Sequence, residues 1–291
     1  MKYKSTPGRV AFDILNSILM ILIFLITVYP FLYVINFSFS TFSQTSGTLL
    51  LIPRGFSVQA YTTLLQDPKI LHAALVSASR SVIGPLLSLA VTGMAAYCLA
   101  VPNLVFRKFF QTFFVLTMYV TGGLIPTYLF TRWYGLANSY LVYIIPTLFS
   151  AYNMILIKTY IESLPRSLQE AVYLDGGDDF VAYWRVIFPV CKPVNAAILL
   201  FGVLTHWNSF MDTQMYCATD QNLHTLQYVL YNTLATNTNL EALKKGTVKI
   251  TASGQTLKMA ITVITVVPVM FVYPFLQKYF VSGIMIGSVK A

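Results

Sequence analysis

Charge is scarce in this sequence, and its scarcity excludes most soluble folds. Only 10% of the 291 residues are charged, whereas 56% are hydrophobic and 15% are aromatic. A water-soluble domain would leave the long uncharged runs without burial. The composition therefore predicts an all-α, polytopic membrane protein, because a helix of about 20 apolar residues crosses a bilayer.

Residue patterns that mark enzymes and metal sites are also missing. The sequence has no G-x-x-x-x-G-K-[ST] phosphate loop, no H-E-x-x-H and no G-x-S-x-G string. Its few cysteines and histidines are isolated along the chain, at Cys98, Cys191, Cys217, His72, His206 and His224. We therefore predict a chain that is not an enzyme and that holds no metal or cofactor, so any ATP hydrolysis belongs to another chain.

Six apolar runs are long enough to cross a bilayer, at about residues 11–35, 73–101, 109–130, 140–160, 194–210 and 257–279. The first run follows a basic flank, as in a signal peptide, but it is too long and has no small-residue cleavage site. We therefore expect an uncleaved first span and a single transmembrane domain over residues 1–291. In the third span, Gly122, Gly123 and Pro126 predict a bend or close helix packing.

The distribution of basic residues predicts the orientation of these spans. An even number of spans places both termini on one side, and the positive-inside rule favours the cytoplasm. Eleven of the nineteen basic residues then lie inside, at Lys2, Lys4, Arg9, Arg107, Lys108, Lys158, Arg166, Arg185, Lys192, Lys278 and Lys290. The formal charge of +9 is thus explained by topology rather than by nucleic acid, and two long loops, Asn36–His72 and Met211–Thr256, are predicted outside.

The loop at residues 161–193 holds half of the ten acidic residues of the chain, which places it in water. Ser163 or Ser167 is expected to cap a short helix, with Ser167 and Glu170 in a capping box. Gly176 and Gly177 then predict a tight turn, and Asp178 a cap for a second helix that Pro189 interrupts. The expected form is helix, turn, helix, with one face of the first helix free to dock.

The spacing of this loop resembles a known family. Glu170-Ala171, then Gly176, then Val186-Ile187-Phe188-Pro189 is similar to the "EAA–G–I-LP" loop of ABC importer permeases, although Val172, Val186 and Phe188 replace other apolar residues of the pattern. Further blocks, including "GGLIPTYLFTRWYGLANSYLVYIIP", "LLFGVLTHWNSFMD" and "YPFLQKYFVSGIMIGSVKA", resemble carbohydrate permeases of the maltose-permease type. The first and last of these are similar to the polysaccharide, alginate and lipoprotein-type subgroup.

The resemblance implies a permease of the bacterial inner membrane that imports oligosaccharides, including acidic, alginate-like ones. Implied partners are a second permease, two ATPase subunits that hold ATP and Mg, and an external substrate-binding protein. The loop would couple to an ATPase through Glu170, Ala171, Asp175, Gly176, Phe188 and Pro189. The tail at 283–290 is a second candidate contact with the ATPase.

Polar residues inside the predicted spans are candidates for the substrate path. They include Trp207, Asn208, Asp212, Arg80, Tyr119 and Asn153. Amide and aromatic side chains suit sugars, and an arginine suits an acidic sugar. The alternative for Arg80, Trp207 and Asp212 is a location near the outer membrane interface without any substrate contact.

Two other functions were weighed. An ion-coupled carrier would be expected to have buried carboxylates along its spans, yet only Asp13 and Asp212 lie near them. An intramembrane enzyme would need a catalytic or metal constellation that the sequence does not contain. The importer permease is the prediction that the sequence favours.

Overall fold

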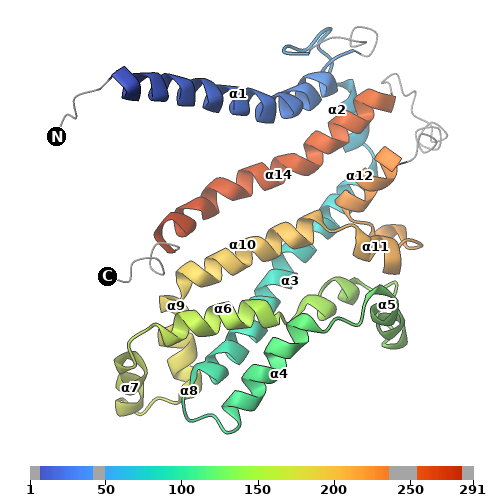
Figure 1. Ribbon diagram of the computed structural model, residues 1–291. Coiled ribbons are helices and arrows are strands. Elements are labelled where there is room, and N and C mark those ends of the chain that lie inside the picture. The colour runs from blue at the N-terminus through green and yellow to red at the C-terminus, as the bar shows by residue number, and fades with distance from the viewer. Residues whose placement is uncertain (1–6, 42–49, 236–253, 284–291) are drawn as a thin grey trace. The chain divides into compact units, whose positions relative to one another are not determined.

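The computed structural model describes residues 7–41, 50–235 and 254–283, with side chains up to residue 271. Within these ranges every regular element is helical, and the one extended pairing is an isolated bridge between Ser40 and Phe56. The all-α prediction is confirmed. Figure 1 shows the long helices and the short elements that join them.

The chain forms two compact units, of which the first comprises Met1–Asp67 and Asn232–Val266. It contains α1 (Pro7–Ser38) and α2 (Gln59–Leu65). The end of α1 is fixed by polar contacts, because Asn36 donates to the carbonyl of Leu50 at 3.1 Å and the Ser38 and Tyr61 hydroxyls lie 2.6 Å apart. Farther back along α1 the apolar side chains are exposed, as expected of a helix that faces lipid.

The second unit comprises Pro68–Tyr231 and Val267–Ala291 and is built around α3 (Pro68–Ala100). Helix α3 packs against α6 (Ala151–Glu162) and α10 (Lys192–Asn208) (Figure 1). The core between them consists of buried apolar residues from all three helices and from the loop that follows α6, among them Leu89, Ala96, Tyr97, Met154, Ile157, Tyr183, Ile187 and Ile198. The same helices therefore position the loop at 163–190.

The predicted third span, 109–130, is not one helix. It consists of α4 (Arg107–Tyr119) and α5 (Leu124–Trp133), which meet at 113°. Gly123 has φ +80°, a backbone conformation that residues other than glycine rarely adopt, and the chain turns there. The Gly122–Gly123 pair indicated the bend, but the pattern of apolar residues continued through it and concealed its size.

The predicted fourth span, 140–160, is also bent, and a further bend lies just before the predicted fifth span, 194–210. Residues 140–160 form two 3₁₀ turns, η2 (Tyr140–Tyr143) and η3 (Ile145–Thr147), followed by α6 at an angle of 47°. The Asp179–Val190 segment meets α10 at 80°. Three helices of the described chain, α1, α3 and α14 (Gly254–Gly283), are long and apolar enough to cross a membrane, and the number rises to six if each bent pair counts as one span.

The two predicted outer loops contain helices as well as turns. Helix α2 lies in the first, whereas α11 (Met211–Tyr216), η5 (Gln221–Leu223) and α12 (Leu226–Ala235) lie in the second. Residues 42–49 and 236–253 of these loops are outside the described chain. The single-domain assignment and the outside location of both loops stay predictions.

Candidate functional site

Helix α7 (Ser167–Leu174) ends in a glycine turn that fixes its tip. Gly176 has φ +78°, its N–H donates to the carbonyl of Tyr173 at 3.1 Å, and the N–H of Gly177 donates to Val172 at 2.9 Å. This pair of hydrogen bonds is the Schellman motif, which satisfies the last carbonyls of a helix. The predicted turn at Gly176 and Gly177 is confirmed.

The predicted capping box at the start of α7 is wrong. Ser167 is the first helical residue, and no side chain caps the helix. The reason lies in the residues before it, because Arg166 already has helical backbone angles and the N–H groups of Leu168 and Gln169 donate to Pro165 and Arg166. A serine cap needs an extended residue at this position, and the chain offers a helical turn instead.

After the turn, Asp178 caps the next helix as predicted, because its carboxylate accepts from the N–H of Val181 at 2.9 Å. The helix runs through α8 (Asp179–Val181), a π-helical turn η4 (Ala182–Ile187) and α9 (Phe188–Val190). The prediction that Pro189 interrupts this second helix is wrong, because the helix continues through Pro189 and ends at Val190. A wider π turn places Tyr183 and Ile187 in the core.

Asp179 joins the loop to the core helix α3. Its Oδ1 accepts hydrogen bonds from the Tyr173 hydroxyl of α7 at 2.5 Å and from the Tyr97 hydroxyl of α3 at 3.2 Å. The hydrogen bond to this carboxylate raises the pKa of Tyr173 above its ordinary value. One carboxylate thus connects three elements, α7, α8 and α3.

The six predicted coupling residues divide into two groups. Glu170, Ala171, Asp175 and Gly176 are exposed on α7 and its turn, beside Leu174, whose side chain is 88% exposed. Phe188 and Pro189 are half-buried, and the Phe188 ring packs on Trp184 at 5.1 Å between ring centres. The tip of α7 therefore presents a leucine and two acids. The tail at 284–290 lies outside the described residues.

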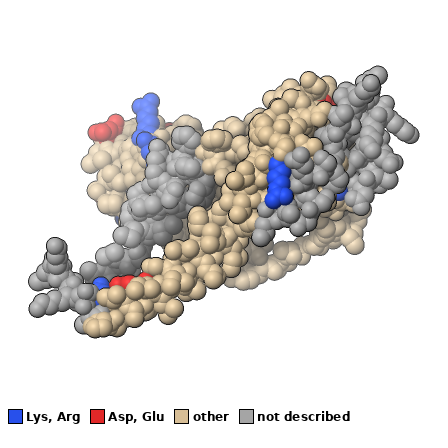
Figure 2. All heavy atoms as spheres, turned by 90° about the horizontal axis from the view of Figure 1, so that it is seen from above, with Lys and Arg blue, Asp and Glu red and all other residues tan. Residues whose placement is uncertain are grey.

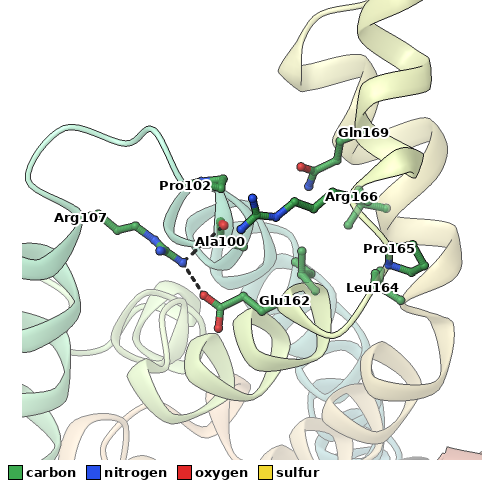
Figure 3. A pocket seen from close by; sticks show the side chains of 10 residues that line it. Ala100, Pro102, Arg107, Glu162, Leu164, Pro165, Arg166 and Gln169 are labelled. Atoms are coloured by element: carbon green, nitrogen blue, oxygen red, sulfur yellow. Dashed lines mark hydrogen bonds and ion pairs between the residues drawn. The ribbon is translucent and has the colours of Figure 1, made fainter.

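A cavity of about 210 Å³ opens beside the start of α7 (Figure 3). The Arg107 guanidinium donates to the carbonyl of Leu99 at 2.8 Å and pairs with Glu162, the last residue of α6. Lys158 shares the same carboxylate at 2.9 Å. Figure 3 shows Arg166 reaching from the loop into the cavity, toward Ala100 at the end of α3.

A second polar cluster surrounds Arg80 in the first half of α3. Its guanidinium is fully buried and donates to the carbonyl of Ser209 at 2.6 Å, to the carbonyl of His206 and to the Asp212 carboxylate at 2.8 Å. It also lies 4.7 Å from the centre of the Tyr143 ring. His206 is in the last turn of α10 and Ser209 is its C-cap residue, so Arg80 satisfies helix-terminal carbonyls that would otherwise be unpaired.

The structure brings only some of the predicted path residues together. Arg80 and Asp212 form one ion pair, and the segment that they fix includes Trp207, which is half-buried, and Asn208, which is exposed at the end of α10. Tyr119 is 81% exposed at the end of α4, and Asn153 is half-buried at the start of α6. Their contact with a substrate stays a prediction.

Sequence reasoning missed the residues that hold these sites in place, Tyr97, Tyr173, Asp179 and Arg107. Tyr97 and Arg107 have partners that are far away along the chain, Asp179 and Glu162, and although Tyr173 and Asp179 are only six residues apart, no local pattern marked that pair. The acidic density of the loop was the one available signal for Asp179. Among the described residues, no group of three or more His, Cys, Asp or Glu is placed to hold a metal ion.

Comparison with known proteins identifies relatives along almost the whole chain. The polygalacturonan/rhamnogalacturonan transport system permease protein YtcP of Bacillus subtilis is 34% identical over 96% of this chain and 98% of its own length. Protein LplC of the same organism is also 34% identical, over 99% of this chain and 97% of its own.

A solved structure has the same fold. It is a chain of a bacterial ABC transporter involved in the import of the acidic polysaccharide alginate, with a TM-score of 0.87, 28% identity and coverage of 96% of this chain and 100% of its own. Residues 70–286 match the family described as binding-protein-dependent transport system inner membrane component. With three-quarters of its length in that match, this chain belongs to the family of inner membrane components of binding-protein-dependent transport systems.

Proposed function

We propose that this chain is the permease subunit of an ABC importer that takes up acidic oligosaccharides from a substrate-binding protein. The observation that carries the proposal is the shared chemistry of two full-length relatives, since the names of both refer to acidic polysaccharides, polygalacturonan or rhamnogalacturonan and alginate. An ion-coupled carrier is set aside, because members of this family depend on a binding protein.

In this proposal the chain pairs with a second permease, and two ATPase subunits bind ATP and Mg beneath them. Both termini and the loop at 161–193 face the cytoplasm, where α7 inserts into a cleft of one ATPase. Closure of the nucleotide sites pulls on α7 and rocks the spans between inward and outward access. Residues 284–290 are a further proposed contact.

The geometry of the loop supports a mechanical role for α7. Its exposed tip offers Leu174 for apolar contact and Glu170 and Asp175 for basic partners. Behind the tip, Tyr173 and Asp179 connect α7 with Tyr97 of α3. Because α3 is the central helix of its unit, force applied to α7 reaches the helices α6 and α10 that pack on α3.

For the substrate path we propose Trp207 and Asn208, with Tyr119 and Asn153 as further candidates. Asn208 is exposed and offers an amide to sugar hydroxyls. Arg80 has a different part in this proposal, since its donors are bound to protein oxygens and hold the segment that carries these two residues.

Uptake by cells that lack the gene tests the proposal. Loss of uptake of oligogalacturonate or alginate oligosaccharides, with normal uptake of neutral maltooligosaccharides, is the expected result. Complementation with the unchanged gene restores uptake, whereas a Glu170→Lys variant that assembles normally does not. Loss of neutral but not acidic oligosaccharide uptake would refute the substrate class, and full activity of the assembled Glu170→Lys variant would refute the coupling role.

A further inference from the structure

The cavity beside α7 has an excess of positive charge. Arg107 and Lys158 share the single carboxylate of Glu162, and Arg166 adds a third cation. Lys158 does not line the cavity, so the wall itself holds two positive charges, Arg107 and Arg166, and one negative charge, Glu162, an excess of one positive charge. Within the described chain, no carboxylate pairs with Arg166, and Gln169 offers a further donor on the same wall (Figure 3).

Apolar side chains form the rest of the cavity wall. They are Ala100, Pro102, Ile161, Leu164, Pro165 and Ile187, from the ends of α3 and α6 and from the π-helical turn. A small inorganic anion would interact only with the polar side chains of this cavity. A ligand with an anionic head and an apolar body would satisfy both parts of the cavity.

The place of the cavity in the fold points to the membrane boundary. Helix α3 ends at Ala100, α4 begins at Arg107 and α6 ends at Glu162, so three predicted spans terminate around it. Polar loops between spans lie where the hydrocarbon ends. Phe106, the residue before α4, and Phe109, in its first turn, are exposed.

The backbone next to the cavity is held in an unusual conformation. Phe106 precedes Arg107 and has φ +58°, in the left-handed region that a bulky residue rarely occupies. This turn directs Arg107 onto the carbonyls at the end of α3 and onto Glu162. The surrounding contacts therefore maintain a costly geometry that keeps a guanidinium at the cavity wall.

From these observations we propose that the cavity binds the phosphodiester headgroup of an anionic phospholipid. Arg166 and Gln169 donate to the phosphate oxygens, Arg107 closes the opposite wall, and the glycerol and first acyl carbons lie on the apolar side chains. Basic pockets between membrane helices at this depth bind anionic headgroups in other proteins. Such a lipid would tie α3, α4 and α6 to the start of α7, and it is independent of which sugar is carried.

Binding is tested with the full chain, purified and stripped of lipid in a neutral detergent. The probes are phosphatidylglycerol, phosphatidylcholine, glycerol 3-phosphate and inorganic phosphate, and the readouts are the thermal midpoint and the lipid retained in native mass spectrometry. Phosphatidylglycerol is expected to raise the midpoint and to stay bound, whereas phosphatidylcholine and the two soluble phosphates do neither at equal concentration. The variant R166Q should weaken the apparent affinity for phosphatidylglycerol about tenfold.

A matched control separates the cavity from general surface charge. Arg185 is exposed on η4 and does not line the cavity, so R185Q removes the same charge nearby and should leave the affinity unchanged. R166K, which keeps the charge, should retain most of it. An equal loss in R166Q and R185Q, an R166Q variant that binds like the unchanged chain, or saturation by glycerol 3-phosphate alone would each overturn the proposal.

A last experiment tests whether the lipid stays bound in the assembled transporter. Bound phosphatidylglycerol is expected to persist in the complex with the ATPase subunits. Displacement of the lipid on assembly would overturn the proposal and assign the cavity to an acidic side chain of the ATPase.

Discussion

The first half of α3 is held by a buried polar cluster, whereas its C-terminal end is held by polar contacts that are partly exposed to solvent. Around Arg80 the guanidinium is fully buried and surrounded by carbonyl oxygens and one carboxylate. At the other end, Arg107 and Glu162 have side chains that are 29% and 34% exposed, and the loop beyond them rests on Asp179 and a glycine turn.

The difference indicates which end is built to stay fixed. A buried charge that loses its partner is expensive, so the Arg80 cluster has a single workable arrangement. Exposed ion pairs are weak and exchange partners with water at little cost. We infer that the Arg80 region is the rigid part of its unit and that the loop end is the part that moves or accepts partners.

Replacing Arg80 should give the largest effect, because R80M leaves Asp212 and the carbonyls of His206 and Ser209 without their donor. The expected loss is about 3–5 kcal/mol of the free energy of unfolding. Denaturant or thermal unfolding of the purified chain in detergent measures it. R185M, at an exposed arginine, should lie within about 0.5 kcal/mol of the unchanged chain. A loss below about 1 kcal/mol in R80M would contradict the rigid role of this cluster.

Replacing Gly176 should affect the loop end without unfolding the unit. G176A forces a side chain into φ +78°, at a cost of about 1–2 kcal/mol, and loosens the tip of α7. The stimulation of ATP hydrolysis in the assembled transporter should fall severalfold. Gly135 has φ +69° outside the loop, so G135A carries a similar strain and should keep normal stimulation. Equal losses in the two variants would mean that strain alone, not α7, is responsible.

The Tyr173–Asp179 hydrogen bond should make the attachment of α7 sensitive to alkaline pH. The pKa of Tyr173 is raised above its ordinary value of 10, first by its hydrogen bond to Asp179. Its stabilising contribution is therefore complete below pH 10 and is lost as the pH rises through the raised value. The hydroxyl of Tyr97 shares the same carboxylate.

Difference absorbance of tyrosinate between the unchanged chain and Y173F measures this titration. The expected result is one tyrosine that titrates above pH 10, together with a loss of about 1 kcal/mol in Y173F at neutral pH. Y152F, at an exposed tyrosine of α6, is the control. If the tyrosine lost in Y173F titrates at or below pH 10, the hydrogen bond does not hold α7 in solution.

The smallest effect is expected at Lys158. Its pairing with Glu162 is partly exposed and lies within one helix, four residues apart, so K158M should cost about 0.3–0.5 kcal/mol. The free energies of unfolding of K158M and R80M, measured under the same conditions, compare the stability contributions of the two regions. A loss above about 2 kcal/mol would show that the loop end is as rigid as the Arg80 cluster.

Much of the fold followed from local patterns in the sequence. Apolar runs of sufficient length located the long helices α1, α3 and α14, and Gly176 and Asp178 marked the turn and the cap that the structure contains. Gly122 and Gly123 indicated a bend in the third span, but its size was not predicted, because Val120 and Leu124 continue the apolar pattern while the backbone changes direction. The predicted Ser167 cap was wrong because the sequence shows a residue that could cap a helix, but not the backbone conformation at that position.

The candidate sites were only partly accessible from the sequence. Arg80 and Asp212 were singled out as polar residues in apolar surroundings, but 131 positions separate them along the chain, and nothing local indicated that they pair. The loop was identified by its spacing, whereas its connection to α3 depends on Tyr97. Contacts of this kind are decided by packing, which composition and periodicity do not specify.

The 113° turn between α4 and α5 has a consequence for how this chain meets its solvent. Helix α4 has 13 residues, about 20 Å, which is less than the roughly 30 Å of hydrocarbon. The turn at 120–123 carries backbone groups outside any helix, and its residues are exposed on this chain. The hydrocarbon core of a bilayer offers no hydrogen-bond partners to those backbone groups. If α4 starts at the membrane surface, this turn is expected to face water or the surface of another subunit rather than lipid.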